Sequence, residues 1–125
     1  FPSYEIPGFK IGRYHHMSQE VDPDTMDRDV HPEDEETLRS FTSRYFPLAA
    51  GPTLALKTCM FTNSPDGHFI IDLHPKYSQV SIAAGFSGHG FKFCSVVGEI
   101  MADLVQKSET SHDLTLFRLE RLGLL

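Results

Sequence analysis

Apolar and polar positions recur along the chain with two different periods, and each period predicts a type of element. In residues 8–16, apolar side chains such as Phe9 and Ile11 occupy alternate positions, a spacing that is typical of a β-strand with one face covered. Further strands are predicted over residues 53–62, 69–72 and 80–84, of which the last is expected to be buried.

Two helices are predicted from the longer period. The first begins at Pro32, which four acidic residues follow, since proline fits the first helical turn and carboxylates favour the positive end of the helix dipole. Its apolar stripe contains Leu38, Phe41 and Tyr45, and Pro47 ends it. The second helix covers about residues 91–106, with an apolar face formed by Phe93, Val97, Ile100, Met101 and Leu104.

Turn residues separate these elements. Proline, glycine, asparagine and aspartate favour chain reversal at residues 63–67, and His74-Pro75 begins another turn. Residues 22–25 are either a turn or the start of a helix. Residues 114–119 either alternate or form a short final element. The predicted organisation is therefore strands and helices along the chain, without a repeat.

The length of 125 residues is enough for one modest core and too short for two complete domains. No apolar run approaches the roughly 20 residues of a membrane span, and the first residues do not resemble a signal peptide. We therefore expect a cytoplasmic protein that does not act in a membrane. Because the chain lacks an initial Met, we also expect it to begin within a longer protein.

The net charge of −6 argues against a nucleic-acid partner, since such proteins usually carry a basic patch. Residues 20–36 hold nine acidic residues and one basic residue. We interpret this window as a solvated loop and a helix N-terminus. A calcium loop is excluded because the window lacks the glycine that such a loop requires.

The two cysteines, Cys59 and Cys94, have neither the number of a disulfide scaffold nor the spacing of a zinc site. No histidine cluster has ligand spacing either, so we expect no metal. Cys94 is expected to be a core residue.

A glycine-rich turn, G-F-S-G-H-G at residues 85–90, lies between a predicted strand and a predicted helix. This arrangement presents backbone N–H groups and a helix dipole to an anion. Its spacing differs from the dinucleotide-binding G-x-G-x-x-G, so anion or cofactor binding and a tight structural turn both remain open. Lys92 follows the turn, where a cation indicates either an anionic partner or simple exposure.

Several strings resemble the C-terminal part of the monomeric sarcosine oxidase family. They are F-I-I-D-L-H-P at 69–75, I-A-A-G-F-S-G-H-G-F-K-F at 82–93, T-C-M-F-T at 58–62, D-P-D-T at 22–25, P-E-D-E at 32–35 and F-P-S at 1–3. The resemblance implies an FAD-dependent oxidase that oxidises the C–N bond of secondary amino acids such as sarcosine and reduces O2 to H2O2.

The resemblance also implies an α+β fold that forms the C-terminal segment of a two-domain flavoprotein. Residues 1–57 would belong to an antiparallel-sheet substrate domain, and residues 58–125 would add closing strands and a helix to the FAD-binding domain. The upstream part of the same protein would then be a partner, and we expect the isolated chain to be inactive.

For the cofactor, the resemblance implies covalent attachment of FAD through Cys59. The turn residues Gly88, His89 and Gly90 would face the flavin together with Lys92. Lys92 also matches the lysine that binds the substrate carboxylate.

Four further residues match positions around the substrate. Lys10 corresponds to a lysine that assists O2, and His15 to an active-site histidine, although a one-residue insertion leaves His16 open. Phe1 and Phe61 would line the substrate pocket. Phe61 stands where well-known members have Tyr, which puts sarcosine itself in doubt as the preferred substrate.

The alternative is a domain derived from the same fold that binds a small ligand or a protein without catalysis. The presence of flavin in the full-length protein distinguishes the two interpretations.

Overall fold

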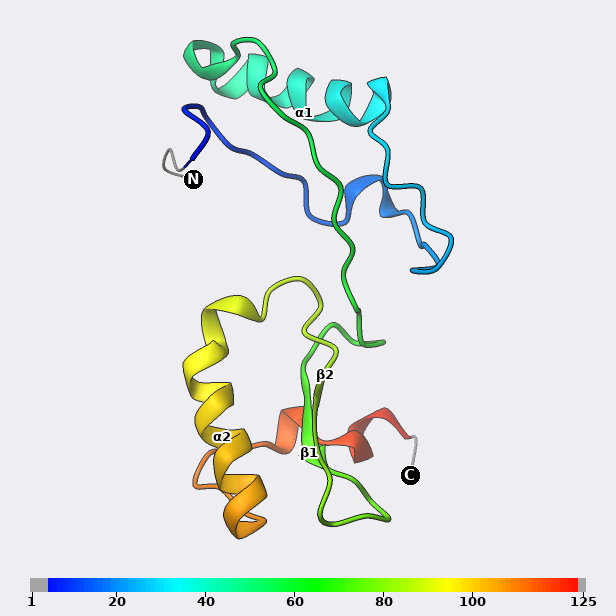
Figure 1. Cartoon of the computed structure of the whole chain (residues 1–125), viewed down its shortest axis with the longest axis vertical. Coiled ribbons are helices and arrows are strands. Elements are labelled where there is room, and N and C mark those ends of the chain that lie inside the picture. The colour runs from blue at the N-terminus through cyan, green and yellow to red at the C-terminus, as the bar shows by residue number, and fades with distance from the viewer. Residues whose placement is uncertain (1–4, 124–125) are drawn as a thin grey trace. The chain divides into compact units, whose positions relative to one another are not determined.

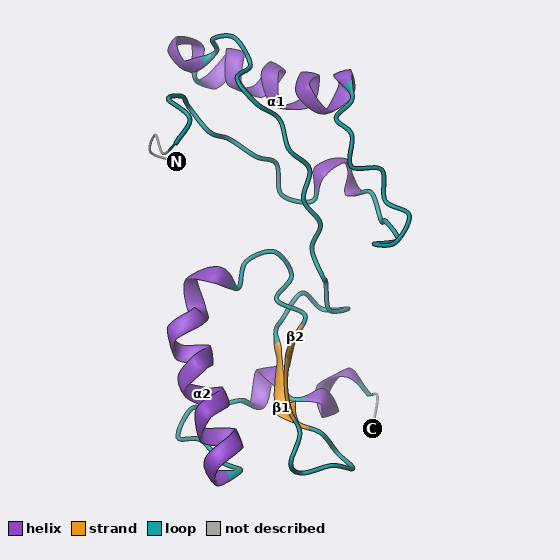
Figure 2. Ribbon diagram, viewed as in Figure 1, coloured by secondary structure: helices purple, strands orange, loops and turns teal. Residues whose placement is uncertain are grey.

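The computed structural model describes residues 5–123 and forms two compact units, Phe1–Met60 and Phe61–Leu125 (Figure 1). Within the described residues, the chain has two α-helices and a two-stranded antiparallel sheet, together with short 3-10 helices (Figure 2). This confirms the α+β class. None of the helices in residues 5–123 has the length and apolar character needed to cross a bilayer.

The first unit is organised around helix α1, Pro32–Tyr45, which begins where the sequence predicts. The His31 backbone N–H donates to Asp34 Oδ2 at 2.9 Å, and the Asp34 backbone N–H donates to the His31 carbonyl at 3.0 Å. These reciprocal bonds pair two groups at the helix start. The helix ends before Pro47, which opens the 3-10 helix η2, Pro47–Ala49.

The apolar stripe of α1 is not buried within its unit. Phe41 is 48% exposed and Tyr45 is 56% exposed, and their ring centroids lie 4.6 Å apart. The residue of α1 that is buried is Thr42. The periodicity therefore predicted the helix correctly. The aromatic face that it marks is exposed in this unit.

The strand predicted over residues 8–16 is wrong. The segment has no strand, and it leads into the 3-10 helix η1, His16–Ser18. His15, Met17 and Ser18 have φ angles of 50°, 52° and 52°, in the left-handed region that a strand does not use. Alternation of side chains alone did not detect this change of backbone conformation.

The strand predicted over residues 53–62 is also wrong. The structure shows an irregular segment there, followed by one isolated bridge between Asn63 and Phe86. A strand requires a neighbour for its N–H and C=O groups. Across the described part of the chain, the only ladder is the one that joins β1 and β2.

The second unit contains two of the predicted strands, which pair with each other as a hairpin. Strand β1, Ile70–Leu73, pairs antiparallel with β2, Ser81–Ala84, so that Ile70 faces Ala84 and Leu73 faces Ser81. Helix α2, Cys94–Lys107, follows the short 3-10 helix η3, Phe91–Phe93, and lies along the hairpin (Figure 1). The short final elements are η4, Thr115–Phe117, and η5, Leu119–Leu122.

The core of this unit joins the hairpin, α2 and the C-terminal segment. Its buried apolar residues are Phe69, Ile71, Ile100, Leu104 and Leu114. The predicted face of α2 is thus confirmed at its centre.

Two burial predictions in this unit are wrong. Strand β2 is half-buried rather than buried, with Ala83 exposed, because the sheet has only two strands to share the core. Cys94, expected in the core, is exposed at the first residue of α2. Its position lies off the stripe that Ile100 and Leu104 bury.

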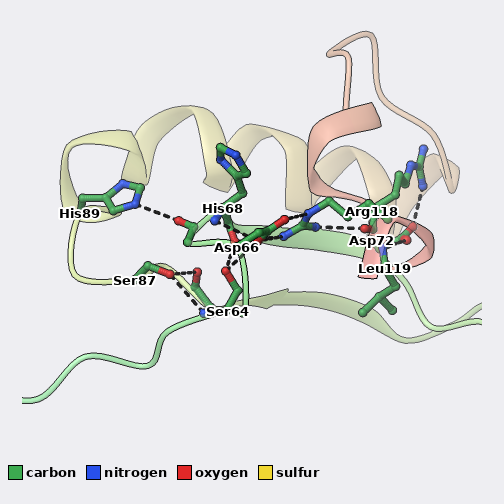
Figure 3. A network of polar contacts seen from close by, with 11 residues as sticks. Ser64, Asp66, His68, Asp72, Ser87, His89, Arg118 and Leu119 are labelled. Carbon is green, nitrogen blue, oxygen red and sulfur yellow. Dashed lines mark hydrogen bonds and ion pairs between the residues drawn. The ribbon is translucent and has the colours of Figure 1, made fainter. Parts of the chain in front are cut away.

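A polar network ties the C-terminal segment to the hairpin (Figure 3). The buried Asp72 carboxylate accepts hydrogen bonds from Arg118 Nη1 at 2.6 Å, the Leu119 backbone N–H at 2.9 Å and the Leu73 backbone N–H at 2.8 Å. Burial alone would raise the pKa of Asp72, but these bonds outweigh it and hold the pKa below its usual value.

A second pair lies nearby. Arg121 donates to both carboxylate oxygens of Asp66, at 2.7 and 3.0 Å. Because this bidentate bond stabilises the ionised carboxyl, it lowers the pKa of Asp66. Asp72 thus fixes the start of the η5 segment to β1, and Asp66 fixes Arg121 of this segment to the turn that precedes β1.

Candidate functional site

The glycine-rich turn between β2 and α2 depends on left-handed backbone at three positions. Gly85, Ser87 and Gly88 have φ angles of 61°, 50° and 76°. Within the turn, the His89 N–H donates to the Phe86 carbonyl at 3.0 Å, and the Phe93 N–H donates to the Gly90 carbonyl at 2.9 Å. The chain therefore reverses tightly before η3 and α2 begin.

Phe61 packs directly on Gly88. A Cβ atom at Gly88 would lie 2.7 Å from Phe61 Cγ and 2.8 Å from both Cδ atoms, which is closer than real Cβ contacts allow. Glycine is therefore required there by the aromatic contact as well as by its φ angle. The structure thus brings together two residues, Phe61 and Gly88, that the resemblance assigned separately to substrate and cofactor.

Gly90 is restricted in the same way, since a Cβ atom there would lie 2.5 Å from Phe86 Cδ1. His89 is exposed, and its Nε2 lies 3.1 Å from the Gly67 carbonyl, while its ring centroid is 5.0 Å from that of Phe69 (Figure 3). The imidazole of His89 therefore connects the glycine turn to the turn at residues 64–67.

Lys92 is exposed in η3, with Nζ 5.5 Å from the ring centroid of Phe93. The first turn of α2, which the structure describes in full, contains no acidic residue. The positive end of the helix and the lysine charge therefore point to the same kind of ligand, an anion.

Cys59 and Lys10 belong to the first unit, and both are exposed. Cys59 is a free thiol. An exposed thiol is accessible for reaction, as covalent attachment of a cofactor requires.

The two adjacent histidines have different surroundings. His16 Nε2 lies 2.7 Å from Asp34 Oδ1, so this ring is held at the start of α1. Hydrogen bonds from the His31 N–H and from His16 lower the pKa of Asp34. His15 is exposed and packs edge-on against Tyr14, with ring centroids 4.1 Å apart. Phe1, the remaining predicted pocket residue, lies outside the described residues.

Sequence reasoning missed three polar residues that organise these units: Ser87, Asp72 and Asp34. Two of them carried a usable signal. Ser87 is the one side chain with a hydroxyl inside the glycine turn, and Asp72 is a carboxylate inside an apolar strand, where burial demands a partner. For Asp34, the four consecutive acidic residues concealed which one caps the helix.

Residues 7–104 match the family described as "FAD dependent oxidoreductase". The chain belongs to this family. It is 54% identical over 123 residues to monomeric sarcosine oxidase from Bacillus sp. (strain NS-129), an alignment that covers 97% of this chain and 32% of that protein. Peroxisomal sarcosine oxidase from Mus musculus is 43% identical over 130 residues, covering 99% of this chain and 32% of the relative.

A third relative matches a shorter stretch. N-methyl-L-tryptophan oxidase from Escherichia coli (strain SMS-3-5 / SECEC) is 52% identical over 63 residues, which is 50% of this chain and 17% of the relative. These matches confirm the resemblance that the motifs indicated. The chain spans about a third of the length of the curated sarcosine oxidases it matches.

Solved structures agree on the fold. Fructosyl peptide oxidase from E. terrenum superposes with a TM-score of 0.58 at 26% identity, covering 73% of this chain and 21% of that one. A thermally stable mutant of fructosyl peptide oxidase also gives a TM-score of 0.58, at 24% identity, and covers 91% of this chain and 25% of that one.

The described residues fit the FAD that the family implies. An exposed thiol at Cys59 suits a covalent bond to a flavin. The exposed turn at Gly88 and His89, together with Lys92 and the start of α2, suits the negative charge that a reduced flavin carries. Within residues 5–123, no cluster of three or more His, Cys, Asp or Glu side chains is arranged to hold a metal ion.

Proposed function

We propose that this chain is the C-terminal part of an FAD-dependent oxidase of secondary amino acids such as sarcosine. The proposal is carried by the 54% identity to a monomeric sarcosine oxidase, which extends over 97% of the chain. In the proposed reaction, the amine loses two electrons and two protons and becomes an imine, O2 gains them and becomes H2O2, and water then hydrolyses the imine. Bound FAD accepts the two electrons and passes them to O2.

The rest of the flavoprotein would supply what the chain lacks. We propose that residues 1–57 belong to the substrate domain and residues 58–125 to the FAD-binding domain. The relatives are about three times as long as this chain, so an upstream part would hold the ADP half of FAD. The helix N-terminus of a βαβ unit is the usual site for that pyrophosphate.

Two residues of this chain would bind the substrate. Lys92 would pair with its carboxylate, since the lysine is exposed beside the positive end of α2. Phe61 would form an apolar wall, because its ring is fixed against Gly88. Phenylalanine lacks the hydroxyl of the corresponding Tyr, so this wall favours a larger or more apolar amine than sarcosine.

The cofactor would be held by Cys59, through a thioether, and by the turn at Gly88, His89 and Gly90. Lys10 would place a positive charge where O2 is reduced, and preorganised charges of this kind stabilise a developing anion. His15 would be the active-site histidine, and His16, which the one-residue insertion leaves open, is the alternative.

The test uses the full-length protein, purified and supplied with sarcosine or N-methyl-L-tryptophan while H2O2 is measured. We expect a yellow protein whose flavin stays in the pellet after acid precipitation. In Cys59→Ser, acid should release the flavin. Cys94→Ser, which alters the other exposed thiol, serves as the control and should retain it.

Two outcomes contradict the proposal in different ways. A colourless protein without H2O2 production would support the non-catalytic alternative. A Cys59→Ser protein whose flavin resists acid would refute the attachment site and leave the oxidase function standing.

A further inference from the structure

Ser87 occupies an unusual position in the glycine turn. It is 2% exposed and has a φ angle of 50°, although it carries a side chain. A non-glycine residue in this region costs roughly 1–2 kcal/mol. Buried hydroxyl groups are also costly unless they are hydrogen-bonded. A glycine would avoid both costs, so the hydroxyl must contribute something that offsets them.

The hydrogen bonds of Ser87 identify that contribution (Figure 3). Its Oγ accepts from the Ser64 backbone N–H at 3.2 Å and donates to the Gly85 carbonyl at 3.0 Å. Its own backbone N–H donates to the Thr62 carbonyl at 3.1 Å. Ser87 therefore joins the glycine turn to the segment at residues 62–64 through both its side-chain hydroxyl and its backbone N–H.

That segment comes directly after Phe61. Since the bonds to Thr62 and Ser64 fix the backbone next to Phe61, they also fix the position from which the Phe61 side chain extends. The ring then meets Gly88, the residue that follows Ser87, at the close distance described above. The bond from the Ser87 N–H to the Thr62 carbonyl flanks the isolated antiparallel bridge between Asn63 and Phe86, which places the two segments side by side.

We propose that Ser87 is a positioning residue, whose hydroxyl holds the Phe61 ring against Gly88. This inference rests on the proposed function, in which Phe61 lines the substrate pocket and Gly88 faces the cofactor. Ser87 itself is buried and acts through Phe61. Its loss would leave the segment at residues 62–64 attached by fewer bonds, and the ring would leave Gly88.

The contact has a direct spectroscopic signature. One α-hydrogen of Gly88 points toward the Phe61 ring, because it takes the direction of the excluded Cβ atom. Aromatic ring current shifts such a hydrogen in NMR spectra. The resonance of this Gly88 α-hydrogen is measured in full-length protein labelled with ¹³C at glycine. The Phe61→Leu variant gives the chemical shift of the same hydrogen when the aromatic ring is absent.

We expect Ser87→Ala to move the Gly88 resonance at least about half of the way toward its position in Phe61→Leu. Ser87→Gly should do the same, since it relieves the backbone strain and also lacks the hydroxyl. Ser95→Ala, which removes an exposed hydroxyl in the first turn of α2, is the matched control and should leave the resonance unchanged. A Gly88 resonance that stays in place in the Ser87 variants would overturn the proposal.

A second measurement needs no variant. The Ser64 N–H donates to a buried oxygen, so it should exchange with solvent far more slowly than an unprotected amide. Exchange at the unprotected rate in the wild-type protein would refute the proposal even if the Ser87 variants fail to fold.

In the flavin-loaded oxidase, Ser87→Ala should raise KM for sarcosine roughly tenfold while kcat changes less than about twofold, the pattern for loss of uniform substrate binding. An equal loss in kcat would oppose a positioning role toward substrate. The NMR and exchange measurements do not depend on flavin. A protein without flavin would therefore refute the proposed function alone, and an unmoved Gly88 resonance in a flavin-loaded protein would refute the Ser87 proposal alone.

Discussion

Replacing Asp72 with Asn should weaken the attachment of the C-terminal segment to the hairpin. Asn keeps one acceptor oxygen and replaces the other with an NH2 group, which cannot accept a hydrogen bond. The variant therefore loses either the bond from the Leu119 N–H, which Oδ2 accepts, or those from Arg118 and the Leu73 N–H, which Oδ1 accepts. Hydrogen bonds to a charged group contribute about 1.5–3 kcal/mol each. The Arg118 side chain is 44% exposed, so its pairing is screened by water and adds about 1 kcal/mol or less.

We therefore expect Asp72→Asn to lower the free energy of unfolding by about 2–3 kcal/mol, most of it from the interior bonds. Urea unfolding followed by far-UV circular dichroism measures this change. Arg118→Gln should cost about 1 kcal/mol or less, because it leaves the Leu119 bond intact. Asp29→Asn, at an exposed loop position, is the control for loss of one negative charge.

The effect should depend on pH with a defined sign. Because the folded state holds the pKa of Asp72 below its usual value, the stabilisation is present above the unfolded pKa of about 3.9 and is lost as pH falls through the folded pKa. The gap between wild type and Asp72→Asn should thus be constant from about pH 5 to 7 and shrink below about pH 4. A gap under about 0.5 kcal/mol at pH 7, or one that grows toward low pH, would refute this reasoning.

Three further predictions concern other parts of the chain. Gly88→Ala should destabilise the second unit by about 1–2 kcal/mol through its positive φ, with an added cost for displacing Phe61. Gly98→Ala, in α2 with open space around it, should instead stabilise by up to about 1 kcal/mol, and equal effects of both variants in urea unfolding would contradict this. Asp27 raises the pKa of His31 by accepting its hydrogen bond, so the pair stabilises the fold below the ordinary histidine pKa and the effect is lost as pH rises through the raised one. Asp27→Asn should return the NMR-measured pKa of His31 toward about 6.5, and an unchanged titration would count against the pair. In the proposed full-length oxidase, Lys10→Met should slow reoxidation of the reduced flavin about 100-fold and leave its reduction by substrate nearly unchanged. Stopped-flow traces with both half-reactions equally slowed would exclude the proposed role of Lys10.

The sequence predicted those elements whose conformation is determined by residues within the element itself. Pro32 and the acidic residues after it marked the start of α1, and the stripe through Ile100 and Leu104 marked the buried face of α2. The glycine turn was also visible, because its residues adopt conformations that few others tolerate. Each of these signals lies within one element, so the sequence pattern was sufficient.

The failures concern relations between distant segments. Residues 53–62 have the composition of a strand, but a strand forms only where another segment pairs with it. The left-handed backbone at His15 and Met17 occurs at residues that are not glycine, so the sequence did not indicate it. The contact of Phe61 with Gly88, and the bonds of Ser87 that support it, join positions more than 20 residues apart and become visible only in three dimensions.

The two aspartate–arginine pairs also join residues that the ribosome adds at very different times. Asp72 and Arg118 are 46 positions apart, and Asp66 and Arg121 are 55 apart. At roughly 5–20 residues per second, a ribosome needs about 2–10 s to reach Arg118 after it has added Asp72. Throughout that interval the hairpin has a carboxylate without its cation, so the second unit is completed only after nearly all of its residues have been made. A nascent chain halted before Arg118 would lack the bonds of Arg118 and Leu119 to Asp72, so the second unit gains this part of its stability only at the end of its synthesis.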